Sequence, residues 1–139
     1  MQSSTTKKVI FLCNKLGRDK DLENFKAQGI VPKYKMLSGD EWRTELQRKL
    51  VEEVTEVSEA KNAEEITDEL ADILIVIKGL CKAYGISIEN LERIKQKKYV
   101  QRGGFEQGLY IERLEMESSN PKVRYFRASP GKYPEVEQS

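Results

Sequence analysis

Residues 49–72 read KLVEEVTEVSEAKNAEEITDELAD, a charged pattern that predicts two helices joined by a tight turn. The first helix belongs to a run without Gly or Pro that extends from Glu41 to Lys61. Asn62 begins the second helix as an N-cap, with Glu65 placed to reach back to the cap, and Gly85 ends it. Because the connection near Asn62 is short, the two helices must fold back on each other as an antiparallel hairpin.

Two glutamates of the first helix lie at the edge of its apolar face. With about 100° per residue and Leu50 at the centre of the apolar stripe, Glu53 falls about 60° away. Glu56 falls one step further out, at about 120°. Glu52 and Glu59 point to the opposite, hydrated side. The glutamates thus divide into an ordinary surface pair and a pair at the edge of the core.

The second helix repeats this arrangement. Ile73 centres its apolar stripe, and Glu69 and Asp72 lie about 40° and about 100° away, in the same rotational sense as the acids of the first helix. When two helices form an antiparallel hairpin, acidic edges that lie in the same rotational sense from the apolar stripes emerge on the same side of the hairpin. The acids also match in position along the helix axes. The numbers of two residues that face each other across an antiparallel hairpin add up to a constant, which places Glu53 opposite Asp72 and Glu56 opposite Glu69. Four carboxylates therefore converge on two neighbouring helical turns.

The composition narrows the chemistry open to these carboxylates. The 139 residues include no histidine, which excludes nucleophiles activated by histidine and metal sites built on imidazole. Crowded carboxylates beside apolar side chains repel one another and lose hydration. A hard divalent cation removes both penalties, so the sequence predicts a site for Mg²⁺ or Mn²⁺. The alternative, which holds for most single glutamates, is that these are hydrated residues of charged helices.

Charge is segregated along a chain whose formal net charge is only +1. Residues 52–72 hold nine acids and one base, whereas residues 93–102 hold five bases and no acid. A third helix is expected over residues 88–101, and its inward face carries three cations: Lys95, Lys98 and Arg102. Cations beside a carboxylate-bound metal suit phosphoryl or pyrophosphoryl chemistry, because both neutralise developing negative charge. The alternative is a hydrated basic face that only complements the acidic hairpin.

Two short motifs in the hairpin resemble those of a known superfamily. The string EVTE at residues 53–56, followed after twelve residues by ELAD at 69–72, is similar to the ExxE and ExxD motifs of the MazG-like all-α nucleoside triphosphate pyrophosphohydrolases. NKLGRDK at residues 14–20 and RGGFE at residues 102–106 resemble the predicted house-cleaning branch of this superfamily, which is similar to phosphoribosyl-ATP pyrophosphohydrolase. The resemblance extends from about residue 13 to residue 116.

The resemblance implies a set of functional residues. It implies that four acids bind Mg²⁺, and they are Glu53, Glu56, Glu69 and Asp72. It also implies that residues 14–20, called the early segment below, contribute basic residues to the phosphate site. These are Lys15, Arg18 and Lys20. This segment departs from the family at Gly17 and at residues 21–22, where apolar and Ile-Pro residues are expected.

An oligomer is expected on two grounds. The resemblance implies a dimer or a higher assembly. Independently, Ile75 lies on the far side of the second helix from Ile77, so this helix is apolar nearly all round. One hairpin and a short third helix are too small to cover such a helix on both sides. We therefore expect a homo-oligomer, a dimer or a tetramer, in which the hairpins form a helix bundle.

Together these observations predict a Mg²⁺-dependent nucleoside triphosphate pyrophosphohydrolase with a house-cleaning activity on non-standard nucleotides. Water would attack phosphorus, with Glu53 or Glu56 accepting its proton, to give a nucleoside monophosphate and pyrophosphate. Phosphoribosyl-ATP is the alternative substrate within the same fold and chemistry. A non-catalytic helical oligomerisation or regulatory module is the alternative of a different class. Nucleic-acid binding through residues 93–102 is not expected, because the adjacent hairpin is acidic.

The expected architecture is mainly α-helical, with the pyrophosphohydrolase domain over residues 1–116 and a loosely held tail over residues 117–139. Short strands are expected at residues 9–13 and from residue 109 toward residue 116. No apolar run is long enough to span a membrane, and residues 1–8 do not lead into an export signal. Cys13 and Cys81 lie in apolar stretches and are expected to be buried thiols of a cytoplasmic protein.

Overall fold

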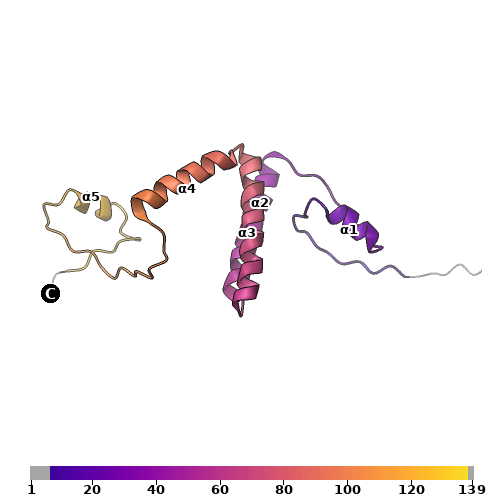
Figure 1. Ribbon diagram of the computed structural model, residues 1–139, viewed down its shortest axis with the longest axis horizontal. Coiled ribbons are helices and arrows are strands. Elements are labelled where there is room, and N and C mark those ends of the chain that lie inside the picture. The colour runs from indigo at the N-terminus through magenta and orange to yellow at the C-terminus, as the bar shows by residue number, and fades with distance from the viewer. Residues whose placement is uncertain (1–6, 138–139) are drawn as a thin grey trace, which may run out of the picture. The chain divides into compact units, whose positions relative to one another are not determined.

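The computed structural model describes residues 7–137, which form helices and connecting segments without a strand (Figure 1). Five helices are present in this range: α1 (Asp21–Ala27), α2 (Gly39–Glu59), α3 (Ala63–Tyr84), α4 (Ile88–Arg102) and α5 (Lys122–Arg127). The chain divides into two compact units, one that ends at Gln101 and one that begins at Arg102. The expected mainly α-helical class is therefore confirmed.

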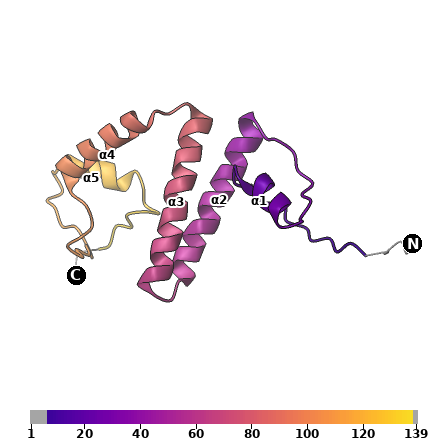
Figure 2. The ribbon, with the colours of Figure 1, turned by 45° about the vertical axis from the view of Figure 1, so that its right-hand side comes forward.

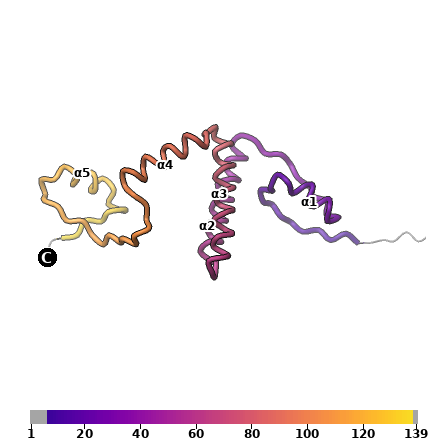
Figure 3. The backbone as a smooth tube through the Cα atoms, viewed as in Figure 1, coloured from indigo at the N-terminus to yellow at the C-terminus, as the bar shows by residue number. Residues whose placement is uncertain are grey.

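The long helices α2 and α3 pack side by side as an antiparallel hairpin (Figure 2 and Figure 3). The buried core consists of Leu46 on α2 and of Val76 and Ala83 on α3. Gly79 lets the two helices approach closely, because a Cβ atom at this position would lie 3.0 Å from Leu46 Cδ2. Burial of this apolar surface sets the spacing between facing residues of α2 and α3, on which the candidate site depends.

Local signals close the hairpin at the turn that the sequence predicts. The backbone N–H of Glu65 donates to Asn62 Oδ1 at 2.9 Å and thereby caps α3. The Glu65 carboxylate in turn accepts a hydrogen bond from the backbone N–H of Lys61 at 2.8 Å. At the other end, Gly85 has a φ of 68°, the left-handed conformation that ends helices. The predicted hairpin and its capping signals are confirmed.

One chain covers only part of the apolar surface of its hairpin. The core lies around Val76, while Ile73, the centre of the predicted stripe, is half-buried. Several large apolar side chains of α2 and α3 remain exposed: Val51, Val54, Leu70, Leu74 and Ile75. Soluble monomers seldom expose this much apolar surface on neighbouring helices.

Both predicted strands are absent from residues 7–137, and this part of the prediction is wrong. Residues 9–12 have no regular secondary structure and are between 76% and 87% exposed. A β-strand needs a neighbouring strand for its backbone hydrogen bonds, and neither residues 9–13 nor residues 109–116 have one within the described chain. The β-forming residues of these two segments therefore do not form strands, because no neighbouring strand pairs with them in the described chain.

The cysteines differ in part from expectation, and the predicted tail contains a short helix. Cys81 is buried and Cys13 is exposed, so burial is confirmed for one thiol and wrong for the other, and both thiols are free. Cys13 is the last residue of the predicted strand at residues 9–13, and because that strand does not form, its thiol stays exposed. The segment expected to be loosely held contains α5, where Phe126 and Tyr133 stack edge to face and Arg127 pairs with Glu135 at 2.8 Å. The boundary at residue 116 stays a prediction.

Within the described residues, none of the helices has the length and apolar character that crossing a lipid bilayer requires.

Candidate metal centre

Three carboxylates from the two arms of the hairpin meet at one point. Glu53 of α2 and Glu69 and Asp72 of α3 each place an oxygen so that these atoms lie within 4.8 Å of one another. Glu69 and Asp72 are three residues apart, which puts them on neighbouring positions of one helix face. The packing of α2 on α3 then brings Glu53 to the same face. Oxygen atoms at this spacing suit a hard divalent cation.

Burial makes this cluster unusual for surface helices. Glu53 is 3% exposed and is the buried charged residue of the described chain. Its Oε2 atom, and Oε2 of Glu69, are buried without a hydrogen-bond partner among the described residues. A buried carboxylate oxygen without a partner costs free energy, because it has lost water and gained nothing in return. A cation bound at these oxygens would remove that cost.

Glu56, the fourth predicted ligand, lies outside the group of three but beside Glu69. A hydrogen bond between the carboxyl groups of Glu56 and Glu69 is the main cause that raises the pKa of Glu69 to about 7. Burial of Glu69 and its proximity to Glu53 raise this pKa further. The structure therefore brings all four predicted acids near one another, with three of them close enough to share one ion.

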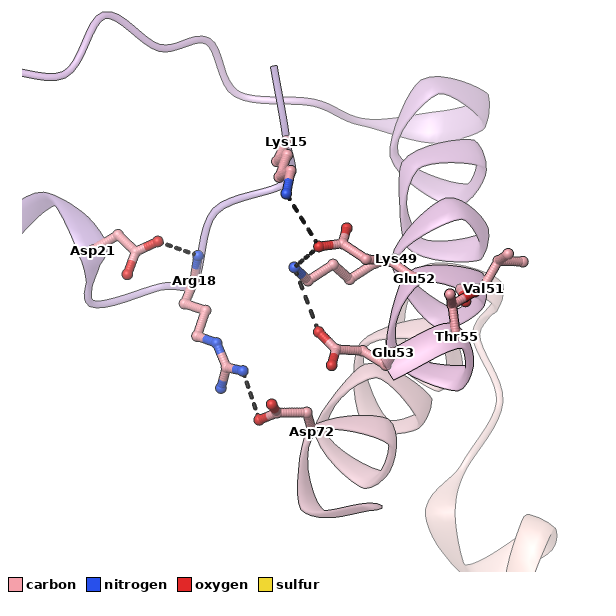
Figure 4. A network of polar contacts seen from close by, with 9 residues as sticks. All are labelled: Lys15, Arg18, Asp21, Lys49, Val51, Glu52, Glu53, Thr55 and Asp72. Atoms are coloured by element: carbon pink, nitrogen blue, oxygen red, sulfur yellow. Dashed lines mark hydrogen bonds and ion pairs between the residues drawn. The ribbon is translucent and has the colours of Figure 1, made fainter. Parts of the chain in front are cut away.

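The early segment supplies cations to the acids (Figure 4). Arg18 Nη2 donates to Asp72 Oδ1 at 2.7 Å, and this carboxylate raises the pKa of the guanidinium above its ordinary value. The backbone N–H of Arg18 donates to Asp21 Oδ2 at 2.8 Å, which holds the turn before α1. Lys15 Nζ lies 3.3 Å from Glu52 Oε1. Two of the three cations expected in this segment thus lie at the acidic face of the hairpin.

Sequence reasoning missed the part that Glu52 and Lys49 take in this cluster. Glu52 was expected on the hydrated side, but its side chain is 31% exposed and pairs with both Lys15 and Lys49. Although burial alone would raise the pKa of Glu52, these two lysines outweigh it and lower the pKa. Lys49 Nζ also lies 3.5 Å from Glu53 Oε1. The spacing of three and four residues from Lys49 to the two glutamates was the signal that could have found this bridge.

The other predicted phosphate ligands are exposed. Lys95 forms an ion pair at 2.8 Å with Glu92 of its own helix, α4. Lys98 and Arg102 are exposed on α4, and Lys20 is exposed at the start of α1. Among the described residues of the first unit, the structure brings Lys15 and Arg18 to the acids but does not bring Lys20, Lys95 or Lys98 into an ion pair with them.

An open groove lies at the turn end of the hairpin, next to the cluster. Its lining includes Glu56 and Glu69 together with residues of the turn and of the first part of α3, among them Glu59, Asn62 and Asp68. The groove is acidic, so a phosphate could approach it only with a cation present to offset the repulsion. The arrangement therefore suits a metal-assisted reaction of a phosphate-bearing substrate.

Part of the chain matches a known protein family. Residues 33–98 match the family model described as phosphoribosyl-ATP pyrophosphohydrolase. Neither the curated proteins nor the solved structures give a significant match. The matched segment contains α2, α3 and most of α4, and with them all four acids and Lys49. Three predicted phosphate ligands of the early segment, Lys15, Arg18 and Lys20, precede it, and Arg102 follows it.

Proposed function

Residues 33–98 form a phosphoribosyl-ATP pyrophosphohydrolase domain of the MazG-like all-α superfamily, and on this premise we propose that the chain is a Mg²⁺-dependent nucleoside triphosphate pyrophosphohydrolase. The family hydrolyses phosphoanhydride bonds, so the chain is a hydrolase of this class. The proposed products are a nucleoside monophosphate and pyrophosphate, and the proposed purpose is the removal of non-standard nucleotides. Phosphoribosyl-ATP is the second candidate substrate, which the description of the matching family favours.

The convergence of Glu53, Glu69 and Asp72 is the observation that carries this proposal. The residues fit Mg²⁺, because all three supply oxygen and, among residues 7–137, two of their buried oxygens have no partner and no thiolate joins the group. We assign these three residues and Glu56 as the ligand set, with Mn²⁺ as a substitute ion. When bound, Mg²⁺ supplies Lewis-acid activation of water and neutralises charge on the phosphates.

The acids of the cluster have two proposed roles, which are to bind the ion and to accept a proton from water. Glu53 and Glu56 are the proposed catalytic acids, one of which accepts the proton of the attacking water. Glu56 is the better placed of the two, because it lies beside the group of three rather than within it. As the proposed ligand that lies outside the group of three, Glu56 would be the most free of the four acids to accept a proton.

Cations from two parts of the chain are proposed to bind the substrate phosphates. Arg18 and Lys15 face the acids, and their charge becomes available to phosphates once a metal neutralises the carboxylates. Lys20 belongs to the same segment. The exposed cations of α4, namely Lys95, Lys98 and Arg102, form the second proposed group. Arg18 is suited to a phosphate because its planar guanidinium can bind two oxygens at once.

We also propose that the enzyme is a homo-oligomer, a dimer or a tetramer. The exposed apolar residues of α2 and α3 support this, since a second hairpin packed on them would remove their side chains from water. Such an assembly would complete the helix bundle expected from the sequence. A cytoplasmic location and the lack of nucleic-acid partners stay predictions.

The proposed function is tested by measuring pyrophosphate release from a panel of standard, deoxy and damaged nucleoside triphosphates and from phosphoribosyl-ATP, with and without Mg²⁺. The proposal expects Mg²⁺-dependent release from at least one triphosphate and none in the presence of a chelator. Release from phosphoribosyl-ATP alone would select the second candidate. Absence of release from every substrate, together with absence of Mg²⁺ binding, would instead favour a non-catalytic module.

A further inference from the structure

Lys49 lies one helical turn before Glu53 on α2 and touches two acids at once. Its Nζ atom lies 3.5 Å from Oε1 of Glu52 and 3.5 Å from Oε1 of Glu53. The Lys49 side chain is only 21% exposed, so its ammonium group stands against the cluster rather than in bulk water. Figure 4 shows its terminal nitrogen between the carboxylates of the two glutamates. Neither the comparison with known proteins nor the proposed mechanism gives this residue a part.

The other cations near the cluster pair with acids other than Glu53. Arg18 binds Asp72, and Lys15 binds Glu52. Within residues 7–137, the cation that forms an ion pair with Glu53 is Lys49. Glu53 has the most buried carboxylate of the cluster, with a side chain only 4% exposed, and its nearest facing groups are other acids. Arg18 also acts on Glu53 through its charge, but Lys49 is the cation at ion-pair distance among the described residues, and a buried carboxylate depends strongly on such a contact.

We propose that Lys49 is a positioning residue of the metal centre. Its ammonium group balances the charge of Glu53 while no metal is bound and holds Oε1, which leaves Oε2 without a partner and ready for an ion. The inference rests on the proposed function, because it takes Glu53 as a metal ligand. Lys49 also joins Glu53 to Glu52 and, through it, to Lys15 of the early segment.

Lys49 should affect the metal-free and the metal-bound protein differently. A bound divalent cation neutralises Glu53 by itself, and it is repelled by the nearby ammonium group. Removing Lys49 therefore destabilises the metal-free protein more than the metal-bound protein. By linkage, the metal must then bind more tightly to the variant than to the wild type. A residue that only binds phosphates would leave both the metal-free stability and the metal affinity unchanged.

The test compares Lys49→Met with wild type, with Arg48→Met as the matched control. Arg48 lies next to Lys49 and forms an exposed pair with Glu45, away from the acids of the cluster. Unfolding temperatures are measured in a chelator and in saturating Mg²⁺, and the dissociation constants of Mg²⁺ and Mn²⁺ are measured by calorimetry. Lys49→Arg, which keeps the charge, is the rescue variant.

We expect Lys49→Met to lower the Tm in chelator by several degrees, to gain more Tm from Mg²⁺ than wild type does, and to bind the ion about three- to tenfold more tightly. Lys49→Arg and Arg48→Met should resemble wild type. Equal losses of Tm with and without Mg²⁺, or a weaker metal affinity, would overturn the inference. If Lys49→Met folds only when metal is present, that result supports the inference. The dissociation constant of the metal is then measured on Lys49→Gln instead.

The wild-type measurement separates this inference from the proposed function. If wild type binds Mg²⁺ but Lys49→Met binds it with unchanged affinity, the inference fails while the proposed function stands. If wild type binds no divalent ion, both fail.

Discussion

Arg18 Nη2 lies 2.7 Å from Asp72 Oδ1 and joins two parts of the chain that are 54 residues apart in sequence. This contact places a guanidinium group directly beside one of the proposed metal ligands. Both partners are partly exposed, so the pair adds little to stability. In the proposed mechanism its role is positional, because it would hold a cation where substrate phosphates approach the acids.

Replacing Arg18 should therefore impair activity far more than stability. For Arg18→Met we expect kcat/KM to fall by roughly 10- to 150-fold, which corresponds to about 1.5–3 kcal/mol for a lost charged hydrogen bond. Steady-state pyrophosphate release and thermal unfolding measure the two effects. Lys26→Met, in the exposed last turn of α1, is the control and should retain wild-type kcat/KM. A large loss of Tm with normal activity per folded molecule would contradict the prediction.

Metal binding should depend on Glu69. Glu69→Gln keeps the shape of the side chain and removes a ligand charge, so Mg²⁺ or Mn²⁺ binding measured by calorimetry should weaken sharply. The variant should fold well, because it also removes repulsion among neighbouring carboxylates. Glu59→Gln is the control. Glu52 is unsuited as a control because it pairs with Lys15 and Lys49. Unchanged metal affinity in Glu69→Gln would refute the ligand assignment.

The pH dependence of stability should reveal the same group. The folded protein raises the pKa of Glu69 from 4.5 to about 7, so it holds this proton more tightly than the unfolded chain does. The stabilisation that this proton gives is complete below the unfolded pKa and is lost as the pH rises through the folded value. Without metal, the Tm should fall as the pH rises from about 5 to about 8.

Two comparisons check that this pH effect comes from Glu69. In Glu69→Gln the decrease of Tm should be smaller, because the titrating carboxyl is gone. In saturating Mg²⁺ it should disappear in the wild type, because the ion favours the ionised carboxylate, and metal affinity should rise with pH up to about 7. A wild-type decrease that is identical in Glu69→Gln would assign it to other groups.

Lys98 on α4 is predicted to bind substrate phosphate rather than to support the fold. Its side chain is exposed, so Lys98→Ala should leave the Tm close to wild type. The value of kcat/KM should fall by an amount equivalent to roughly 1.5–3 kcal/mol. Lys97→Ala, an exposed neighbour predicted to point elsewhere, is the control. A lowered Tm with intact activity per folded molecule would show that Lys98 only complements the acidic hairpin.

Ile75 tests the proposed assembly. Ile75 on α3 is 55% exposed, and other apolar residues of the hairpin are also exposed. Ile75→Glu should break the oligomer, and with it the folded state, because a charge would be buried in an apolar interface. Light scattering over a dilution series measures the assembly of wild type and variant, with Lys82→Glu as an exposed control on the same helix. A stable, active wild-type monomer at every concentration would refute the proposal.

The helices and the approximate site could be predicted from the sequence because their causes are local. Asn62 and Gly85 mark helix ends through contacts with residues a few positions away. The helical repeat alone places Glu53 and Glu56 on one edge of α2. The short turn makes α3 antiparallel to α2, which brings Glu69 to the same edge. These steps need no knowledge of distant contacts.

Other features were settled only by tertiary contacts. Glu52 was assigned to water by its angle on the helix, yet Lys15 from a distant segment reaches it. Long side chains reach about one helical turn, so the angle of a Cβ atom does not determine where a charged group lies. The β-propensity of residues 9–13 likewise had no effect, because a strand requires a partner that the described chain does not supply.

The sequence by itself therefore determined the helical hairpin, its caps and the edge that carries the acids, since each follows from backbone periodicity and short-range hydrogen bonds. Only the tertiary structure decided that Glu53 is the buried acid, that three of the four carboxylates share one point, and that Arg18 pairs with Asp72. The physical reason is that burial and ion pairing depend on how α2, α3 and the early segment pack, which no local pattern encodes.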